Sequence, residues 1–254
     1  MIFLIKKVLS AYKITYYLSM QMTKYQDILK KILNKGYSFI KFDQLNQSDK
    51  LQILLRHDID LEVDLALKMA KIEKEMGVES TYFFLMSNES YNLISSTNIK
   101  KLKEIKDLGH TISLHFDMTI YRNSKIGFSE ESDLFNKIFK ENINIVSIHR
   151  PIKDFLEKPD CYFDIPNTYE KTFTKDISYF SDSGGSFRYG HPLDSKAFLN
   201  NKNIQLCIHP VWWIDNKEDI HQTIYGVVER KKERCLEHFD RSIKTFQPSN
   251  KKIA

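Results

Sequence analysis

The sequence predicts an α/β fold in which a largely parallel sheet forms a (β/α) barrel. Short apolar segments alternate with amphipathic helical segments along residues 25–245. Most of the short apolar segments are followed directly by Asp, His or Arg residues, and the carboxyl ends of barrel strands meet at a single site. A structural protein has no reason to carry such residues at that rim, so the pattern favours an enzyme.

Length and composition fit one catalytic domain. The chain has 254 residues, of which 42% are hydrophobic and 28% are charged, which is enough to build the core of a single barrel. We expect this domain at residues 23–246, after an N-terminal extension at 1–22 and before a polar tail at 247–254. The extension either forms a short amphipathic helix at a membrane surface or precedes a native start near Met20 or Met22, which we prefer.

Charge and cysteine content argue against several classes of function. The excess of 38 basic over 33 acidic residues is only +5, and the lysines are spread over amphipathic segments, so we expect no nucleic-acid partner. The three cysteines are widely spaced and form no Cys-x-x-Cys motif, which indicates free thiols and a cytoplasmic protein. No segment reaches the ~18 apolar residues of a membrane span, so no stable membrane insertion is expected. The oligomeric state is left open.

The helices and strands follow from the hydrophobic periodicity. Helices are predicted at residues 25–34, 61–76, 99–108, 130–141 and 217–245. Gly36, Gly77 and Gly109 follow the first three of these at the position where glycine ends a helix. Strands are predicted at residues 51–60, 80–86, 111–116, 143–148, 161–169, 177–180 and 204–208, with a short strand or extended connection at 37–42.

The strand at residues 51–60 ends in the sequence Arg-His-Asp-Ile-Asp. Side chains alternate along a strand, so Asp58 and Asp60 share one face and His57 takes the other. Two buried carboxylates on one face need a compensating cation. Many hydrolases hold a divalent metal with one such carboxylate and keep the other as a base. The alternative is a surface turn in which Asp60 caps the following helix.

Later strands end in similar residues, which are His115 and Asp117, His149 and Arg150, Asp182, and His209. One carboxylate and two imidazoles suit a divalent metal, with Zn²⁺ first and Co²⁺, Ni²⁺ and Mn²⁺ as alternatives. Asp60 and His115 are the first two predicted ligands. The third is His149 or Asp117, and we prefer His149 because an imidazole keeps the metal a stronger Lewis acid. His110 faces away from His115 and is expected to satisfy a backbone group.

The remaining rim residues can take roles in an acid–base hydrolysis. Asp58 is expected to be the base that takes a proton from the attacking water, and His209 the acid that protonates the leaving nitrogen. Arg150 orients Asp58, stabilises an oxyanion, or is an ordinary surface arginine. Trp212 and Trp213 follow His209 closely, and their rings either stack on a sugar or belong to the core or a lid.

Four segments resemble motifs of the polysaccharide deacetylase superfamily (NodB homology, carbohydrate esterase family 4). They are Asp58-Ile59-Asp60 after an apolar strand, the Gly-His-Thr-Ile-Ser-Leu-His segment that ends at His115, Arg150-Pro151, and Leu206-Cys207-Ile208-His209. The resemblance implies a distorted (β/α) barrel that uses a divalent metal to remove acyl groups from amino sugars. It also implies that Asp58 is the base, that Asp60 and His115 bind the metal, and that Arg150 and His209 are the arginine and histidine of later motifs.

Two positions depart from the family pattern. Thr119 stands where the family has a second metal histidine, four residues after the first, and Ile59 separates two aspartates that the family places side by side. Asp182, in Asp-Ser-Gly-Gly, resembles a fourth-motif position only loosely. Asp182 and Asp117 are therefore expected to contact the substrate, Asp182 from a glycine-rich loop.

The sequence thus predicts a metal-dependent hydrolase that removes an acetyl or formyl group from the amino sugar of a glycan or nucleotide-sugar precursor, as in branches tied to surface-polysaccharide synthesis. One alternative is a catalytically lapsed deacetylase fold that only binds glycan, which the missing motif histidine suggests. Another is a hydrolase of small non-sugar amides on the same scaffold.

Overall fold

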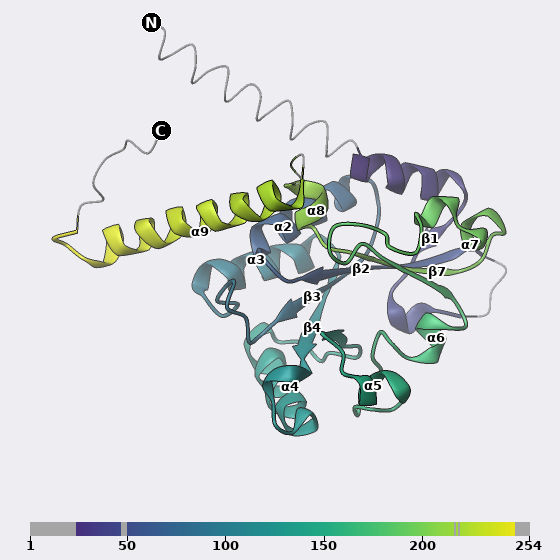
Figure 1. The fold of residues 1–254 in the computed structure, drawn as a ribbon, viewed down its shortest axis with the longest axis horizontal. Coiled ribbons are helices and arrows are strands. Elements are labelled where there is room, and N and C mark those ends of the chain that lie inside the picture. The colour runs from purple at the N-terminus through teal and green to yellow at the C-terminus, as the bar shows by residue number, and fades with distance from the viewer. Residues whose placement is uncertain (1–23, 47–49, 216, 218, 247–254) are drawn as a thin grey trace, which may run out of the picture.

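The computed structural model describes residues 24–46, 50–215, 217 and 219–246 (Figure 1). The predicted N-terminal extension and C-terminal tail lie outside these residues. Within the described part of the chain, no helix combines the length and apolar character needed to cross a membrane.

The described residues form one sheet of seven strands. The strands are β1 (Ser38–Phe39), β2 (Gln52–Ile59), β3 (Thr81–Leu85), β4 (Thr111–Asp117), β5 (Ser147–His149), β6 (Ser178–Ser181) and β7 (Ile204–Ile208). Their order is β5-β4-β3-β2-β7-β6, with β1 added beside β2, and every pair is parallel. No strand pairing joins β5 to β6 among the described residues, so the barrel is distorted and incompletely closed. The predicted fold class is confirmed.

Helices connect the strands and cover the outside of the sheet (Figure 1). The long ones are the helix at residues 24–34, α2 (Val63–Glu75), α3 (Ser96–Asp107), α4 (Ser124–Phe139) and α9 (Ile220–Ser242). The short ones are α5 (Lys153–Glu157), α6 (Lys171–Thr174), α7 (Lys196–Leu199) and α8 (Val211–Ile214), with 3-10 turns η1 (Phe42–Gln44), η2 (Met118–Ile120) and η3 (Pro192–Asp194).

Three element predictions need correction. The helix predicted at 130–141 begins earlier, because the Asn123 side chain caps α4 by accepting from the backbone N–H groups of Lys125 and Ile126 at 3.1 and 3.3 Å. The strand predicted at 143–148 is reduced to the three residues of β5. The strand predicted at 161–169 is absent, and only Asn167 forms an isolated bridge, to Val146.

The irregular segment 161–169 has an identifiable cause. Cys161 has a φ of 57°, which no strand accommodates, and Pro166 lacks the N–H group that a sheet needs. Its aromatic residues nevertheless pack in the core, where the rings of Phe163 and Phe155 lie 6.3 Å apart. The aromatic content that suggested a strand therefore serves packing without regular pairing.

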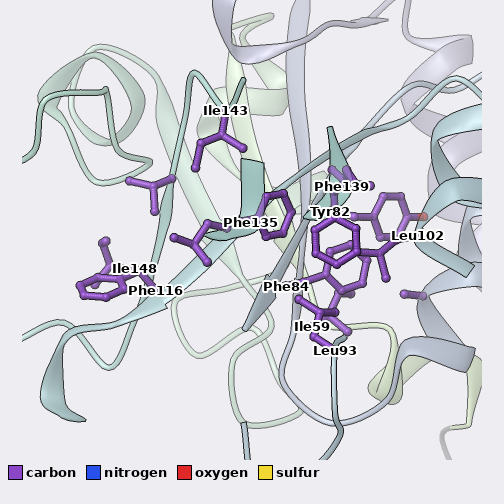
Figure 2. Packing of buried hydrophobic residues seen from close by; sticks show 14 of the residues in the cluster. Ile59, Tyr82, Phe84, Leu93, Leu102, Phe116, Phe135, Phe139, Ile143 and Ile148 are labelled. Atoms are coloured by element: carbon purple, nitrogen blue, oxygen red, sulfur yellow. The ribbon is translucent and has the colours of Figure 1, made fainter. Parts of the chain in front are cut away.

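The core lies between the sheet and its helices. Figure 2 shows one cluster on the outer face, in which Tyr82 and Phe84 of β3 lie close together near Leu102 of α3, and Phe116 of β4 lies beside Ile148 of β5. Every residue of β2 is buried, because strands flank it on both sides and side chains cover both faces. Burial of each such large apolar side chain stabilises the fold by about 1.5–3 kcal/mol.

Parallel pairing brings the carboxyl ends of four strands to one edge. Asp117 of β4 is in register with His149 of β5, and His57 of β2 is in register with Ile208 of β7. His209 follows β7 directly and so lies close to Asp58, which follows His57 in the chain. The register therefore places the predicted acid, base and ligands at the same mouth of the barrel.

Candidate functional site

The end of β2 separates two polar clusters on opposite faces of the sheet. On the outer face, His57 donates from Nδ1 to the Ile208 carbonyl at 3.1 Å and from Nε2 to Glu73 Oε1 at 2.7 Å. His57 therefore links β2 to the end of β7 and to α2. Glu73 also accepts hydrogen bonds from Ser80 at 2.6 Å and from Tyr82 at 2.7 Å, so this cluster holds the sheet to α2 and leaves Asp58 on the inner face.

The three preferred metal ligands converge at the mouth of the barrel. Asp60 Oδ1 lies 3.3 Å from His115 Nε2 and 3.5 Å from His149 Nδ1. One ligand atom from each residue falls within 4.8 Å of the other two. Asp60 Oδ1 is buried and accepts no hydrogen bond of ordinary geometry within the described chain. A buried carboxylate oxygen facing two imidazole nitrogens is a fitting set of donors for a divalent metal.

The protonation of His149 also suits a ligand. Burial, followed by the charge of His115, lowers the pKa of His149. The ring is therefore neutral near pH 7, and the neutral imidazole is the form that binds a metal. The alternative third ligand, Asp117, does not join the cluster of Asp60 and His115.

Asp117 instead fixes the turn that follows His149. It accepts a bidentate contact from Arg150, 3.0 Å to Nε, and further bonds from the Thr119 hydroxyl and backbone N–H at 2.6 and 3.0 Å. Arg150 has a φ of 50°, a strained value for a residue with a side chain. This turn lets His149 point at Asp60 while the adjacent Arg150 turns to Asp117.

The base predicted from sequence has a different arginine partner from the one expected. Arg150 contacts Asp117, whereas Asp58 Oδ2 accepts from Arg56 Nη2 at 3.1 Å. Ser147 donates to Asp58 Oδ1 at 3.1 Å, and the Cys207 thiol lies 3.6 Å from Oδ2. Burial opposes ionisation of Asp58, but the charge of Arg56 outweighs it and holds the pKa of this carboxyl well below its usual range.

Arg56 is fully buried inside the barrel. Its guanidinium carbon lies 5.5 Å and 5.4 Å from the ring centroids of Tyr169 and Tyr179, and its Nη1 donates to Gln205 at 3.2 Å. The side chain is 1% exposed. Sequence reasoning missed Arg56, although it is the charged residue in an apolar strand and shares a face with Asp58 two positions later.

The predicted acid is held by Asp182. His209 Nδ1 donates to Asp182 Oδ1 at 2.5 Å, and the Trp213 indole donates to Oδ2 at 2.6 Å. Burial disfavours the charged ring, but the hydrogen bond and charge of Asp182 outweigh it and raise the pKa of His209 to about 9. Asp182 is buried and both of its oxygens are bonded, which fits a role in holding His209, and its contact with substrate stays a prediction. Asp117 is likewise buried and bonded to Arg150 and Thr119, and its contact with substrate also stays a prediction.

A cavity of about 270 Å³ opens onto these residues. Asp58, Asp60 and His209 line it, and Trp212 forms part of the wall. Trp212 thus faces the site, whereas Trp213 turns its polar edge to Asp182 and packs its ring 5.9 Å from Tyr25. His209 Nε2 lies 3.7 Å from Asp60 Oδ2, so acid and ligand set share the cavity.

Asp58, Cys207 and His209 form a second group with metal-ligand spacing. Its chemistry suits a metal less well. Burial raises the pKa of the Cys207 thiol, Arg56 already neutralises Asp58, and His209 is protonated. For a metal to bind there, Cys207 and His209 would each have to lose a proton, and the buried Arg56 would lose Asp58 as its partner. The group of Asp60, His115 and His149 has none of these obstacles.

No protein-family model and no curated protein matches the chain. A family 4 carbohydrate esterase from Bacillus anthracis is 18% identical, with 83% of this chain and 86% of that chain covered and a TM-score of 0.43. A Streptococcus pyogenes deacetylase in complex with acetate is 18% identical over 47% of this chain, which spans 58% of that protein, with a TM-score of 0.38. A pseudoenzyme of carbohydrate esterase family 4 from Bacillus anthracis is 11% identical, with 75% and 68% covered and a TM-score of 0.39. The chain is thus similar to solved members of carbohydrate esterase family 4, and the roles of its site residues rest on their own geometry.

Proposed function

We propose that the chain is a metal-dependent hydrolase that removes an acetyl or formyl group from the amino sugar of a glycan or nucleotide-sugar precursor. One observation carries the proposal. Asp60, His115 and His149 converge around one point, and Asp58 and His209 line the same cavity from the two neighbouring strands β2 and β7. A ligand set between a carboxylate base and an imidazolium acid is what hydrolysis of an amide requires.

Asp60, His115 and His149 would hold the metal, with Zn²⁺ first and Co²⁺, Ni²⁺ or Mn²⁺ as alternatives. When bound, such an ion supplies Lewis acidity at the acyl carbonyl and makes water a better nucleophile. His149, from β5, takes the place of the motif histidine that Thr119 replaces. Thr119 itself bonds to Asp117 and so supports the turn next to His149.

Asp58 accepts the proton of the attacking water. The charge of Arg56 keeps Asp58 ionised across the neutral range, and the Ser147 hydroxyl fixes its orientation. The same charge makes Asp58 a weaker proton acceptor, so its competence depends on position more than on basicity. Arg56 is therefore the positioning residue for the base in this proposal.

His209 donates the proton that the leaving nitrogen needs. Asp182 holds Nδ1, so the proton on Nε2 is the one available for transfer. With a pKa of about 9, His209 is protonated at neutral pH and is in the form that a general acid requires. Asp182 and Trp213 act through His209 by fixing its ring.

The substrate class follows from the cavity and the motif resemblance. The face of Trp212 beside Asp58 and His209 suits stacking against a sugar ring. The three cysteines are free, which supports a cytoplasmic precursor as substrate. The rival proposals are a glycan-binding protein without turnover and a hydrolase of small amides.

Two measurements test the proposal. Metal analysis of the purified protein should find about one ion per chain, lost in Asp60→Ala and retained in Asp58→Asn. A panel of N-acetyl and N-formyl nucleotide amino sugars, screened for released acetate and formate, should identify a substrate that Asp58→Asn does not hydrolyse. A protein that binds no metal favours the binder, and turnover by Asp58→Asn contradicts the role of the base.

A further inference from the structure

A second cavity, of about 210 Å³, adjoins the first. Trp212 lines both cavities, and the consecutive residues Gly184 and Gly185 line one each. The second cavity is completed by Lys24, Asp182, Ser186, Phe187, His191 and Trp213. The two cavities are therefore neighbours on either side of Trp212, as two subsites for adjacent units of one substrate would be.

The loop between them is built around glycine. Gly184 and Gly185 have φ values of 72° and 83°, which residues with side chains rarely adopt. A Cβ atom at Gly185 would also stand 3.0 Å from the Ile220 side chain and 3.6 Å from Trp212. The conformation of this loop beside Trp212 therefore depends on glycine, because of the positive φ values and the nearby Ile220 side chain, and it shapes the wall of the second cavity.

The carboxylates that line the two cavities are already neutralised, apart from the predicted ligand Asp60. The pairs are Asp58 with Arg56, Asp182 with His209, and Glu62 with Arg230 and Arg234. A substrate therefore meets little uncompensated negative charge beyond the metal site. The net charge that a substrate meets there therefore depends on the cations near the two cavities.

Two cations near the junction have no ion-pair partner among the described residues: Lys24 in the wall of the second cavity, and Arg188, which lies over Gly184 of the first cavity. Lys24 lines the second cavity and is exposed, and no described carboxylate forms an ion pair with it. The Arg188 guanidinium lies over Gly184, with Nη2 2.9 Å from the position of a Cβ there, and it too has no ion pair with a described residue. Both charges are available to an anion at the junction of the cavities.

His191 adds a hydrogen-bond donor. Its Nδ1 accepts from the Leu193 backbone N–H at 3.3 Å, so the proton of the neutral ring resides on Nε2. Burial lowers the pKa of His191, which keeps the ring neutral near pH 7. Its ring packs against Phe187, with centroids 5.3 Å apart, and is thereby fixed at the cavity wall.

We propose that the second cavity is a subsite for an anionic unit of the substrate, a sugar carboxylate or a phosphate joined to the amino sugar that loses its acyl group. Lys24 and Arg188 supply the charge, His191 Nε2 donates a hydrogen bond, and Trp212 separates the anionic unit from the reacting sugar. The assignment of the reacting sugar to the first cavity rests on the proposed function, but anion binding in the second cavity does not depend on turnover.

Binding of small probes tests the subsite directly. Glucuronate and glucose 1-phosphate are compared with glucose by titration calorimetry at low ionic strength. We expect both anions, or one of them, to bind more tightly than glucose, and the preferred anion tells a carboxylate from a phosphate subsite. Lys24→Gln and Arg188→Gln should each weaken that anion about fivefold and leave glucose unchanged, and added salt should remove the preference.

The control is Lys30→Gln, which removes the same charge from an exposed position on the same helix and lines neither cavity. It should bind the anions like the wild type. Equal binding of glucose and both anions overturns the subsite, as does a preference that Lys24→Gln and Arg188→Gln do not change. If the anions bind as expected while no N-acyl amino sugar is hydrolysed, the subsite stands and the proposed reaction fails.

Discussion

Arg56 Nη2 lies 3.1 Å from Asp58 Oδ2, in a setting where the arginine side chain is 1% exposed and the aspartate side chain 5%. A charge pair this deeply buried is costly to break, because removing one partner leaves the other without compensation. In this chain the pair also joins the proposed base to the interior of the barrel. The sequence offered Arg150 for this contact as one of several possible roles, and in the structure Arg56 of β2 itself makes it.

The first prediction concerns Arg56. Arg56→Gln should lower kcat by about 10²-fold or more, because the base loses its orientation, and should leave the metal content near one ion per chain. Arg56→Lys restores a cation without the two-pronged geometry and should recover part of kcat. Metal analysis and steady-state kinetics measure both quantities. Full activity in a folded Arg56→Gln protein would show that Asp58 needs no such partner.

The second prediction concerns the turn after β5. Asp117→Asn removes the charge that holds Arg150. The His149 ring should then be less well oriented toward Asp60, and metal affinity should fall about 10–100-fold. Arg150→Gly also loses the contact but accepts the φ of 50° without strain, so it should lose less affinity than Arg150→Ala. Competition with a chromogenic chelator measures the affinities. Wild-type affinity in both Asp117→Asn and Arg150→Ala would exclude the turn as a support for His149.

The third prediction concerns pH and stability. Burial alone raises the pKa of Glu73, but the charge and hydrogen bond of His57 outweigh it and lower that pKa from 4.5 to about 2. A depressed carboxyl pKa contributes stability above the unfolded value and loses it as pH falls towards the folded value. Glu73→Gln should therefore cost about 3–5 kcal/mol at pH 7. Urea unfolding should show this difference shrinking between pH 4.5 and 2, and a difference that is constant over that range would be inconsistent with the pairing.

The fourth prediction concerns the acid. His209 must be protonated to act, so activity should decline as pH rises through its pKa of about 9. Asp182→Asn keeps a hydrogen-bond acceptor but removes the charge, so the pKa of His209 falls and the alkaline limb of the kcat profile moves to lower pH. Lys30→Gln changes one surface charge that lines neither cavity and should not move the limb. An unshifted limb in Asp182→Asn would assign the titration to another group.

Local sequence patterns predicted part of this structure. The alternation along β2 places Asp58 inward and His57 outward, and the structure shows both where a period of two predicts them. His110 was expected to satisfy a backbone group, and its Nε2 lies 3.0 Å from the Ala70 carbonyl. The convergence of strand ends follows from parallel topology, which the alternation of strands and helices indicates.

What escaped prediction depends on contacts between distant segments. The position of Arg56 in an apolar strand is the one local sign of its burial, and the residues that hold it there, Tyr169, Tyr179 and Gln205, are distant in the chain. The bond between Asp182 and His209 joins the residue after β6 to the residue after β7, so no local sequence pattern indicates it. Segment 161–169 has the composition of a strand, but Pro166 and the positive φ of Cys161 prevent one.

The position of the metal is the central claim, and X-ray absorption spectroscopy of the zinc-loaded protein tests it most directly. Binding by Asp60, His115 and His149 predicts only oxygen and nitrogen neighbours, at about 2.0–2.2 Å, with the outer-shell features of two imidazoles. Binding by Asp58, Cys207 and His209 would add a sulfur neighbour at about 2.3 Å. We expect a spectrum without sulfur that is unchanged in Cys207→Ser, and a zinc–sulfur distance that disappears in Cys207→Ser would contradict binding by Asp60, His115 and His149.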